Sequence, residues 1–150
     1  SSLMAKKLAE TEMMLVASPD YVARRGEPTS LEELSSHELL HYSNLASGNV
    51  WRLRGPSGDE RQVRAVGRLT VNNGDALLEA ATDGLGIALS PAFICADAIR
   101  EGALVEVLAK ARPAPLGVWA VYPSGRFPQP KLRAFIDFLA ERFKTQTPWT

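Results

Sequence analysis

The chain has 150 residues, of which 45% are hydrophobic and 23% are charged, as in an ordinary globular protein. Its 17 acidic and 17 basic side chains balance, so no overall field attracts it to nucleic acid or to an acidic membrane. Cys95 is the only cysteine, which excludes an internal disulfide and fits a reducing compartment. No apolar run approaches the roughly 20 residues that span a membrane.

The first half of the chain alternates short apolar runs with cap and turn signals. Residues 13–17 are typical of a buried strand, and Ser18-Pro19 then predicts a helix cap followed by proline at the first helical position. Ser30 and Glu33 have the spacing of a capping box for a second short helix. The remaining strands predicted in this half are 38–42, 50–53 and 61–66, with a turn at 55–59 between the last two.

The middle of the chain predicts a compact βαβ unit. Residues 69–71 are β-formers, and Asn72-Asn73-Gly74 follows as a helix start in which an asparagine side chain can cap the helix. Gly84 and Gly86 are predicted to end this helix, because positive φ is cheap for glycine. The apolar run 87–89 then indicates a strand buried on both faces of a parallel sheet.

The last part of the chain repeats these signals. Ser90-Pro91 resembles the earlier Ser-Pro helix start, and Gly102 should end the helix that follows. Strands are predicted at 104–107 and 116–122. A final helix is marked by an apolar stripe at i, i+3, i+4, i+7 and i+11, formed by Leu132, Phe135, Ile136, Leu139 and Phe143.

His37-Glu38-Leu39-Leu40-His41 matches the H-E-x-x-H pattern, which places two zinc ligands and a general base on one helix face. That chemistry needs a helix that extends on both sides, and a third ligand nearby. The serines before the motif and the Tyr-Ser-Asn run after it are poor helix formers. We therefore expect His37 and His41 to flank a short strand and to bind no metal.

Two further features favour structural roles. Five arginines alternate with apolar residues in the region of the paired strands: Arg52, Arg54, Arg61, Arg64 and Arg68. Zero net charge gives little attraction to phosphate, so this pattern favours a solvated outer sheet face over a nucleic-acid patch. Cys95 has helical spacing with Ile99 and no histidine beside it in sequence, which is typical of a core thiol rather than a nucleophile.

Two polar segments, 43–49 and 72–74, each follow a predicted strand. In open α/β sheets ligands bind beyond the carboxyl ends of strands, where helix N-termini offer free N–H groups to an anion. The same residues equally suit plain turn and cap chemistry, and the sequence leaves both interpretations open.

The ordered set of elements resembles the effector-binding domain of LysR-type transcriptional regulators. The stretches that carry the resemblance are Leu15 to Val22 with Gly26, Pro28 to Leu34, His37 to Ser43, Trp51-Arg52-Leu53, Val71 to Ala81, Gly84 to Pro91, Tyr122-Pro123 and Leu132 to Phe143. The resemblance implies an α/β, periplasmic-binding-protein-like (type 2) fold with two lobes, crossing strands between them and the effector in the cleft. Residues 18–116 would be a complete second lobe. Residues 1–17 and 117–150 would be the crossing strands and the remainder of a partial first lobe.

The resemblance also implies a sensory domain and no enzyme. It would bind a small-molecule effector, with a carboxylate or another polar metabolite expected, and control the DNA binding of a cytoplasmic homo-oligomer, without a cofactor and without contact to a membrane. DNA would be reached only through an N-terminal winged helix-turn-helix, which this sequence lacks, so we expect a fragment whose final apolar stripe drives self-association. The alternative is a solute-binding protein or an enzyme lobe of the same fold. The second-lobe residues expected to contact the effector are Ser43, Asn44, Ala46, Ser47, Asn72, Asn73 and Ser90.

Overall fold

The computed structural model describes residues 2–125 and 129–146, which form two compact units. The larger unit is Glu12–Ala114, and the smaller unit combines Ser1–Thr11 with Pro115–Thr150. The chain therefore passes between the units at 11/12 and 114/115, compared with the predicted boundaries of 17/18 and 116/117. No helix within the described ranges is long and apolar enough to cross a membrane.

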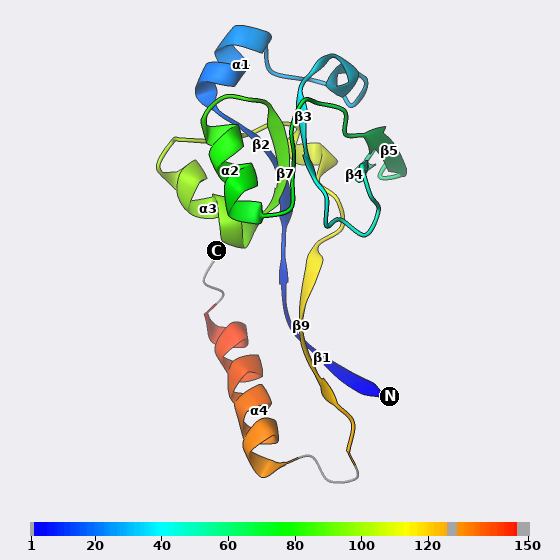
Figure 1. The fold of residues 1–150 in the computed structure, drawn as a ribbon, viewed down its shortest axis with the longest axis vertical. Helices are drawn as coiled ribbons and strands as arrows, with labels where there is room; N and C mark the ends of the chain where they lie inside the picture. The colour runs from blue at the N-terminus through cyan, green and yellow to red at the C-terminus, as the bar shows by residue number, and fades with distance from the viewer. Residues whose placement is uncertain (1, 126–128, 147–150) are drawn as a thin grey trace. The chain divides into compact units, whose positions relative to one another are not determined.

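A mixed sheet forms the centre of the larger unit (Figure 1). Its strands are β2 (Met13–Ala17), β3 (Leu39–Tyr42), β6 (Thr70–Val71), β7 (Ile87–Pro91) and β8 (Val105–Glu106). They lie in the order β6-β3-β7-β2-β8. β3 pairs in parallel with both β6 and β7, whereas β2 runs antiparallel to β7 and β8. As a result, the carboxyl ends of β3, β6 and β7 share one edge of the sheet with the amino end of β2.

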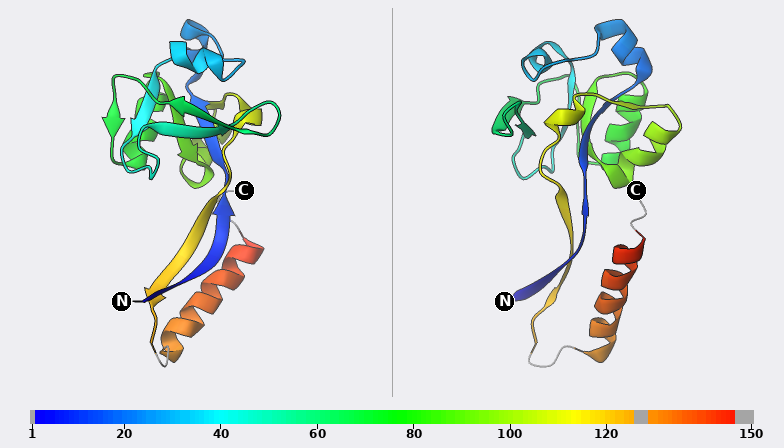
Figure 2. Two further views of the ribbon diagram at one scale, coloured as in Figure 1. Left: turned by 90° about the vertical axis from the view of Figure 1, so that its right-hand side faces the viewer. Right: turned by 180° about the vertical axis from the view of Figure 1, so that it is seen from behind.

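The smaller unit contains the antiparallel pair β1 (Leu3–Thr11) and β9 (Leu116–Pro123), with helix α4 (Pro130–Thr145) against β1 (Figure 2). Lys6 Nζ lies 3.1 Å from Asp137 Oδ1 and so ties β1 to the helix. The predicted final helix is confirmed, and Ile136 on its apolar stripe is buried. Phe135, on the same stripe, is 59% exposed.

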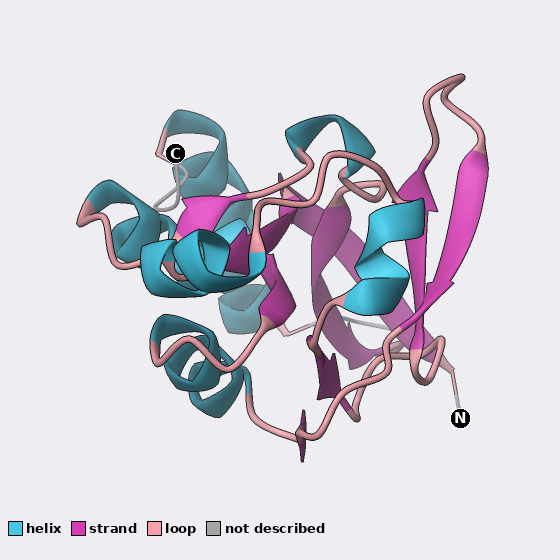
Figure 3. Ribbon diagram, turned by 90° about the horizontal axis from the view of Figure 1, so that it is seen from above, coloured by secondary structure: helices cyan, strands magenta, loops and turns pink. Residues whose placement is uncertain are grey.

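Layers on both faces of the central sheet bury its strands (Figure 3). The helices of the larger unit are α1 (Pro19–Arg25), α2 (Gly74–Thr82) and α3 (Ala92–Arg100), with the 3-10 turns η1 (Glu32–Ser36) and η2 (Ala109–Ala111). Residues of α2 and α3 pack on one face of the sheet. On the other face lie η1 and the separate hairpin of β4 (Val50–Arg54) and β5 (Glu60–Arg64), whose Trp51 and Leu53 are buried.

Successive strand residues point to opposite faces, which explains the continuous apolar runs of β3 and β7. Leu39 and Ile87 belong to the hydrophobic cluster beneath the hairpin. Their neighbours Leu40 and Ala88 belong to the cluster beneath α2 and α3. The predicted strand buried on both faces is therefore confirmed, and so is the βαβ unit, in which β3 lies between its two strands.

Two local signals act as predicted. The Ser18 hydroxyl accepts the Tyr21 N–H at 3.0 Å and caps α1, which has proline in its first turn. The Asn73 side chain caps α2 by accepting two N–H groups of its first turn. Both caps use partners two or three residues away, so the sequence alone determines them.

Two predicted side-chain caps are wrong, although the helices after Ser30 and Pro91 begin close to the expected positions. Ser30 does not cap a helix, because η1 begins with Leu31 at the N-cap position, without a side-chain bond. The Glu33 carboxylate instead accepts the N–H and the hydroxyl of Thr29, at 2.8 and 2.9 Å. Ser90 stays within β7, and α3 begins one residue after Pro91, again without a side-chain cap. The sheet pairing of Ser90 with Met14 takes precedence over the local Ser-Pro signal.

The two glycines after α2 serve different purposes. Gly84 has φ +82°, the positive φ predicted at the helix end. The prediction is wrong for Gly86, which does not have a positive φ. A Cβ at Gly86 would lie 2.4 Å from the Glu38 carbonyl oxygen, so glycine is required there by the close approach of the residues just before β3 and β7.

Candidate functional site

Polar residues from two parallel strands meet at the shared edge of the central sheet. Ser43 and Asn44 follow β3, and Asn72 follows β6. The Ser43 N–H donates to the Val71 carbonyl at 2.8 Å, which extends the pairing of the strands beyond their ends. The Asn44 Nδ2 then donates to the Asn72 carbonyl at 3.1 Å. This bond joins two segments that are 28 residues apart in sequence, and both asparagines are exposed.

Asn73 has a structural role at this edge. Its Oδ1 accepts the N–H groups of Asp75 at 2.8 Å and Ala76 at 3.1 Å. The capping interpretation is therefore confirmed for this oxygen. Among the described residues, no hydrogen bond uses the Asn73 Nδ2, which remains a donor beside the positive end of the α2 dipole.

The other predicted contacts bond locally. The Ser47 hydroxyl donates to the Val50 carbonyl at 2.6 Å, and the exposed Ala46 lies beside Ser47 in the loop after β3. Ser90 lies near the carboxyl end of β7 but is 2% exposed, and its hydroxyl contacts the Pro91 carbonyl at 3.4 Å. The structure thus brings Ser43, Asn44, Asn72, Asn73 and Ser90 to one sheet edge. Of these five, Ser43, Asn44, Asn72 and Asn73 are exposed.

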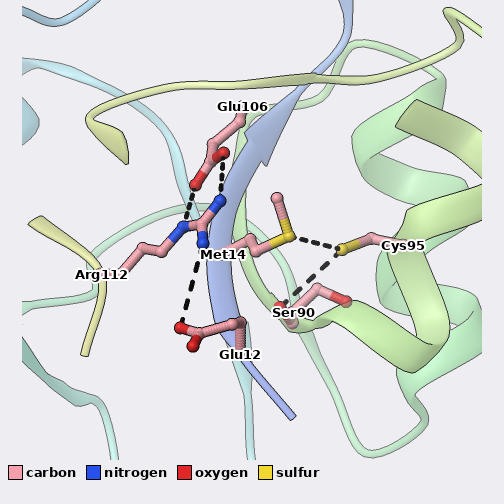
Figure 4. A network of polar contacts seen from close by, with 6 residues as sticks. All are labelled: Glu12, Met14, Ser90, Cys95, Glu106 and Arg112. Atoms are coloured by element: carbon pink, nitrogen blue, oxygen red, sulfur yellow. Dashed lines mark hydrogen bonds and ion pairs between the residues drawn. The ribbon is translucent and has the colours of Figure 1, made fainter. Parts of the chain in front are cut away.

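A charged cluster at the amino end of β2 has no clear sequence signal (Figure 4). The Arg112 guanidinium binds the Glu106 carboxylate through two hydrogen bonds, Nε to Oε1 at 2.6 Å and Nη2 to Oε2 at 2.8 Å. Its Nη1 also lies 3.9 Å from the Glu12 carboxylate. The Glu106 hydrogen bond raises the pKa of Arg112. Because Glu12 and Arg112 lie next to the two points where the chain leaves the larger unit, the cluster ties these points to β8.

Cys95 lies on the opposite side of β2 from Arg112 (Figure 4). Its Sγ is 3.9 Å from Met14 Sδ and 3.9 Å from the Ser90 carbonyl oxygen, and the side chain is fully buried. Burial raises the pKa of the thiol. A protonated thiol inside an apolar cluster is a packing residue, which confirms the core interpretation of Cys95.

The H-E-x-x-H stretch does not form the helix that its zinc chemistry would need. His37 ends η1 and His41 lies in β3. The Tyr21 hydroxyl accepts the Glu38 N–H at 3.2 Å and lies 2.7 Å from His37 Nδ1, to which it is free to donate. Burial, and secondly the charge of Arg25, lower the pKa of His37. Across the described ranges no three His, Cys, Asp or Glu side chains gather as metal ligands would.

The arginines of the hairpin alternate with apolar residues as predicted. Arg52 and Arg54 are exposed, while Trp51 and Leu53 between and beside them point into the core. Arg52 lies 3.7 Å from Glu60, and Arg61 binds Asp59 at 2.5 Å. The outward face of the hairpin is therefore solvated and carries its own acidic partners for two of its arginines.

The sheet order, its two covered faces and its polar edge define a mixed α/β domain of the type 2 periplasmic-binding-protein-like class. The family model of the LysR substrate binding domain matches residues 1–144. The chain belongs to this family, which the sequence resemblance predicted.

Named relatives support the same assignment. The HTH-type transcriptional regulator CrgA of Neisseria meningitidis is 33% identical over 144 residues, covering 94% of this chain and 47% of the relative. The HTH-type transcriptional regulator PgrR of Escherichia coli is 40% identical over 130 residues, covering 85% of this chain and 43% of the relative. Both relatives are transcriptional regulators, the class of protein that the resemblance predicted. The chain spans about half the length of the curated relatives it matches.

Solved structures agree with the sequence relatives. The full-length virulence activator AphB of Vibrio cholerae superposes with a TM-score of 0.82 at 33% identity, covering 94% of this chain and 48% of that chain. The regulatory domain of CrgA from Neisseria meningitidis gives a TM-score of 0.80 at 31% identity, covering 95% of this chain and 69% of that domain.

Proposed function

We propose that this domain is the effector-sensing part of a LysR-type regulator and that its effector binds at the shared edge of β3, β6 and β7. Effector binding would control the DNA binding of a cytoplasmic homo-oligomer, with DNA held by a winged helix-turn-helix outside this sequence. Family membership supports the regulatory role. The main support for the location of the effector site is the Asn44–Asn72 hydrogen bond, because it joins the polar residues after two strands into one surface.

The chemistry of this surface favours a small, polar, weakly charged molecule. Asn44 and Asn73 provide neutral amide groups, and the amino end of α2 attracts negative charge. The exposed Asp75 lies in the same helical turn, and its negative charge opposes the binding of a multiply charged anion. A singly charged carboxylate that also carries a hydroxyl or amide group satisfies both conditions.

The site can be tested by titrating ¹⁵N-labelled protein with lactate, acetate and succinate while following backbone amide resonances. We expect lactate to shift the amides of 43–47 and 72–76. Asn44→Ala should weaken binding about fivefold, the loss expected for one hydrogen bond. Asn73→Asp should also weaken it, because aspartate keeps the cap but removes the Nδ2 donor and adds a charge.

Asn49→Ala, at the other end of the same loop, is the matched control and should leave binding unchanged. Shifts confined to other parts of the domain, or equal affinity in all three variants, would place the effector elsewhere. In a full-length regulator that carries this domain, the first two variants should reduce the effector-dependent change in DNA affinity, and the control should not.

A further inference from the structure

A concave surface lies away from the sheet edge, between the segment before η1, the β4–β5 turn and η2. It is a groove of about 510 Å³. Its apolar walls include Leu31, Pro56, Leu108 and Ala111, and the side chains of Arg54 and Lys110 also line it. None of the residues proposed to contact the effector lines this groove, so it is a separate feature of the same unit.

The groove has an uncompensated positive charge. Arg54 and Lys110 are both exposed, and no aspartate or glutamate lines the groove. Within the described part of the chain, neither cation makes an ion pair or a side-chain hydrogen bond. The two carboxylates of the adjacent turn are engaged elsewhere, because Asp59 binds Arg61 and Glu60 pairs with Arg52. An incoming carboxylate would therefore meet two cations that no internal carboxylate pairs with, while Asp59 and Glu60, which line the adjoining pocket with Arg54, are paired to other arginines.

The backbone that forms one wall is strained. Leu108 has φ 50° and ψ 48°, the left-handed region that bulky residues rarely occupy, and among the described non-glycine residues it alone has a positive φ. This conformation redirects the chain directly after Val107, whose N–H bonds to the Leu15 carbonyl of β2 at 2.9 Å. It brings Leu108 against the core cluster beneath the hairpin while Lys110 stays in solvent. The turn therefore places an apolar side chain, Leu108, and a cation, Lys110, close together on the wall of the groove.

We propose that this groove binds a small organic carboxylate with an apolar body, as a second ligand site on the domain. A carboxylate can accept two parallel hydrogen bonds from the Arg54 guanidinium and pair with the Lys110 ammonium. Its apolar part would lie on Leu31, Pro56 and Leu108, in the way that ligand pockets combine apolar walls with few, well-placed polar groups.

The probe is octanoate, kept below the concentration at which it forms micelles and titrated into the ¹⁵N-labelled chain. We expect shifts in the backbone amides of residues 30–31, 54–58 and 108–111, with the amides of 43–47 and 72–76 unchanged. Octan-1-ol, which has the same chain without the charge, should bind about tenfold more weakly. The double variant Arg54→Gln, Lys110→Gln should weaken octanoate binding about tenfold as well.

Arg64→Gln is the matched control, because it removes an exposed arginine of the same hairpin that does not line the groove. It should bind octanoate like the unsubstituted chain. Absence of octanoate binding, equal affinity for octan-1-ol, or full binding by the double variant would each overturn the proposal. Groove resonances that shift on dilution without any octanoate would show that a second copy of the chain occupies it, and would also overturn it. The outcome is independent of the effector test, since the two experiments report on different amides and different variants.

Discussion

Replacing Asn73 by alanine should destabilise the larger unit by about 1 kcal/mol, the usual contribution of an N-cap side chain. The Oδ1 of Asn73 accepts two first-turn N–H groups, at 2.8 and 3.1 Å, and alanine offers no acceptor in their place. Loss of the cap would fray the start of α2, whose Leu77 and Ala81 are buried against the sheet. The loss of stability should therefore be global rather than confined to the surface.

Thermal unfolding followed by circular dichroism measures the effect. For a unit of this size, about 1 kcal/mol corresponds to a fall in Tm of roughly 4–8 °C. Asn73→Asp is the control, because aspartate accepts the same two N–H groups and adds a negative charge where the helix dipole favours one. Its Tm should equal or exceed that of the unsubstituted chain. A variant with aspartate that is as unstable as the alanine variant would refute the capping account, and so would an alanine variant with an unchanged Tm.

Three further predictions concern other contacts of the larger unit. Because the folded state lowers the pKa of His37, the unfolded chain takes up its proton at higher pH. The contribution of His37 to the free energy of unfolding should therefore be complete above its ordinary pKa of 6.5 and be lost as the pH falls below that value. Urea unfolding at a series of pH values measures this loss of stability, which should be absent in His37→Gln. Gly86→Ala should lower the free energy of unfolding by about 1–3 kcal/mol, because its Cβ would lie 2.4 Å from the Glu38 carbonyl oxygen. Arg112→Met should lower the free energy of unfolding by about 1 kcal/mol, and by less at high salt, because it leaves two carboxylates without their guanidinium. An unchanged urea unfolding curve for Gly86→Ala or for Arg112→Met would contradict the contact that the variant removes.

The sequence predicted the parts of the fold that depend on periodicity and on near neighbours. The apolar runs at 13–17 and 87–89 contain a side chain for each face of the sheet, so their burial can be read directly. The caps at Ser18 and Asn73 bond to groups within three residues. Errors arose where a distant contact competes with a local signal, as when sheet pairing holds Ser90 in β7.

Part of the candidate site could be predicted in the same way. Parallel strands bring their carboxyl ends to one edge, so polar residues after β3 and β6 had to lie near each other. The Asn44–Asn72 hydrogen bond depends on the exact path of two loops, and no pattern in the sequence indicates it. The contact of Arg112 with Glu106 and Glu12 is equally hidden, because its carboxylates are 6 and 100 residues away. Charge pairs of this kind form only because the fold brings the residues together, so they can be identified only once the fold is known.

The two proposed sites differ in the force that would hold a ligand, and salt can separate them. At the sheet edge the donors are neutral amides, and the attraction of the amino end of α2 is opposed by the Asp75 carboxylate in the same turn, so screening by salt has little net effect there. In the groove, Arg54 and Lys110 are exposed cations, and the Debye length shrinks from about 30 Å at 0.01 M salt to about 8 Å at 0.15 M. Octanoate affinity for the groove should therefore fall steeply over this range, while lactate affinity for the edge changes little. Both affinities can be measured on the same labelled chain. If the affinities for lactate and octanoate fell equally with salt, the argument that only the groove binds its ligand through exposed cations would be wrong.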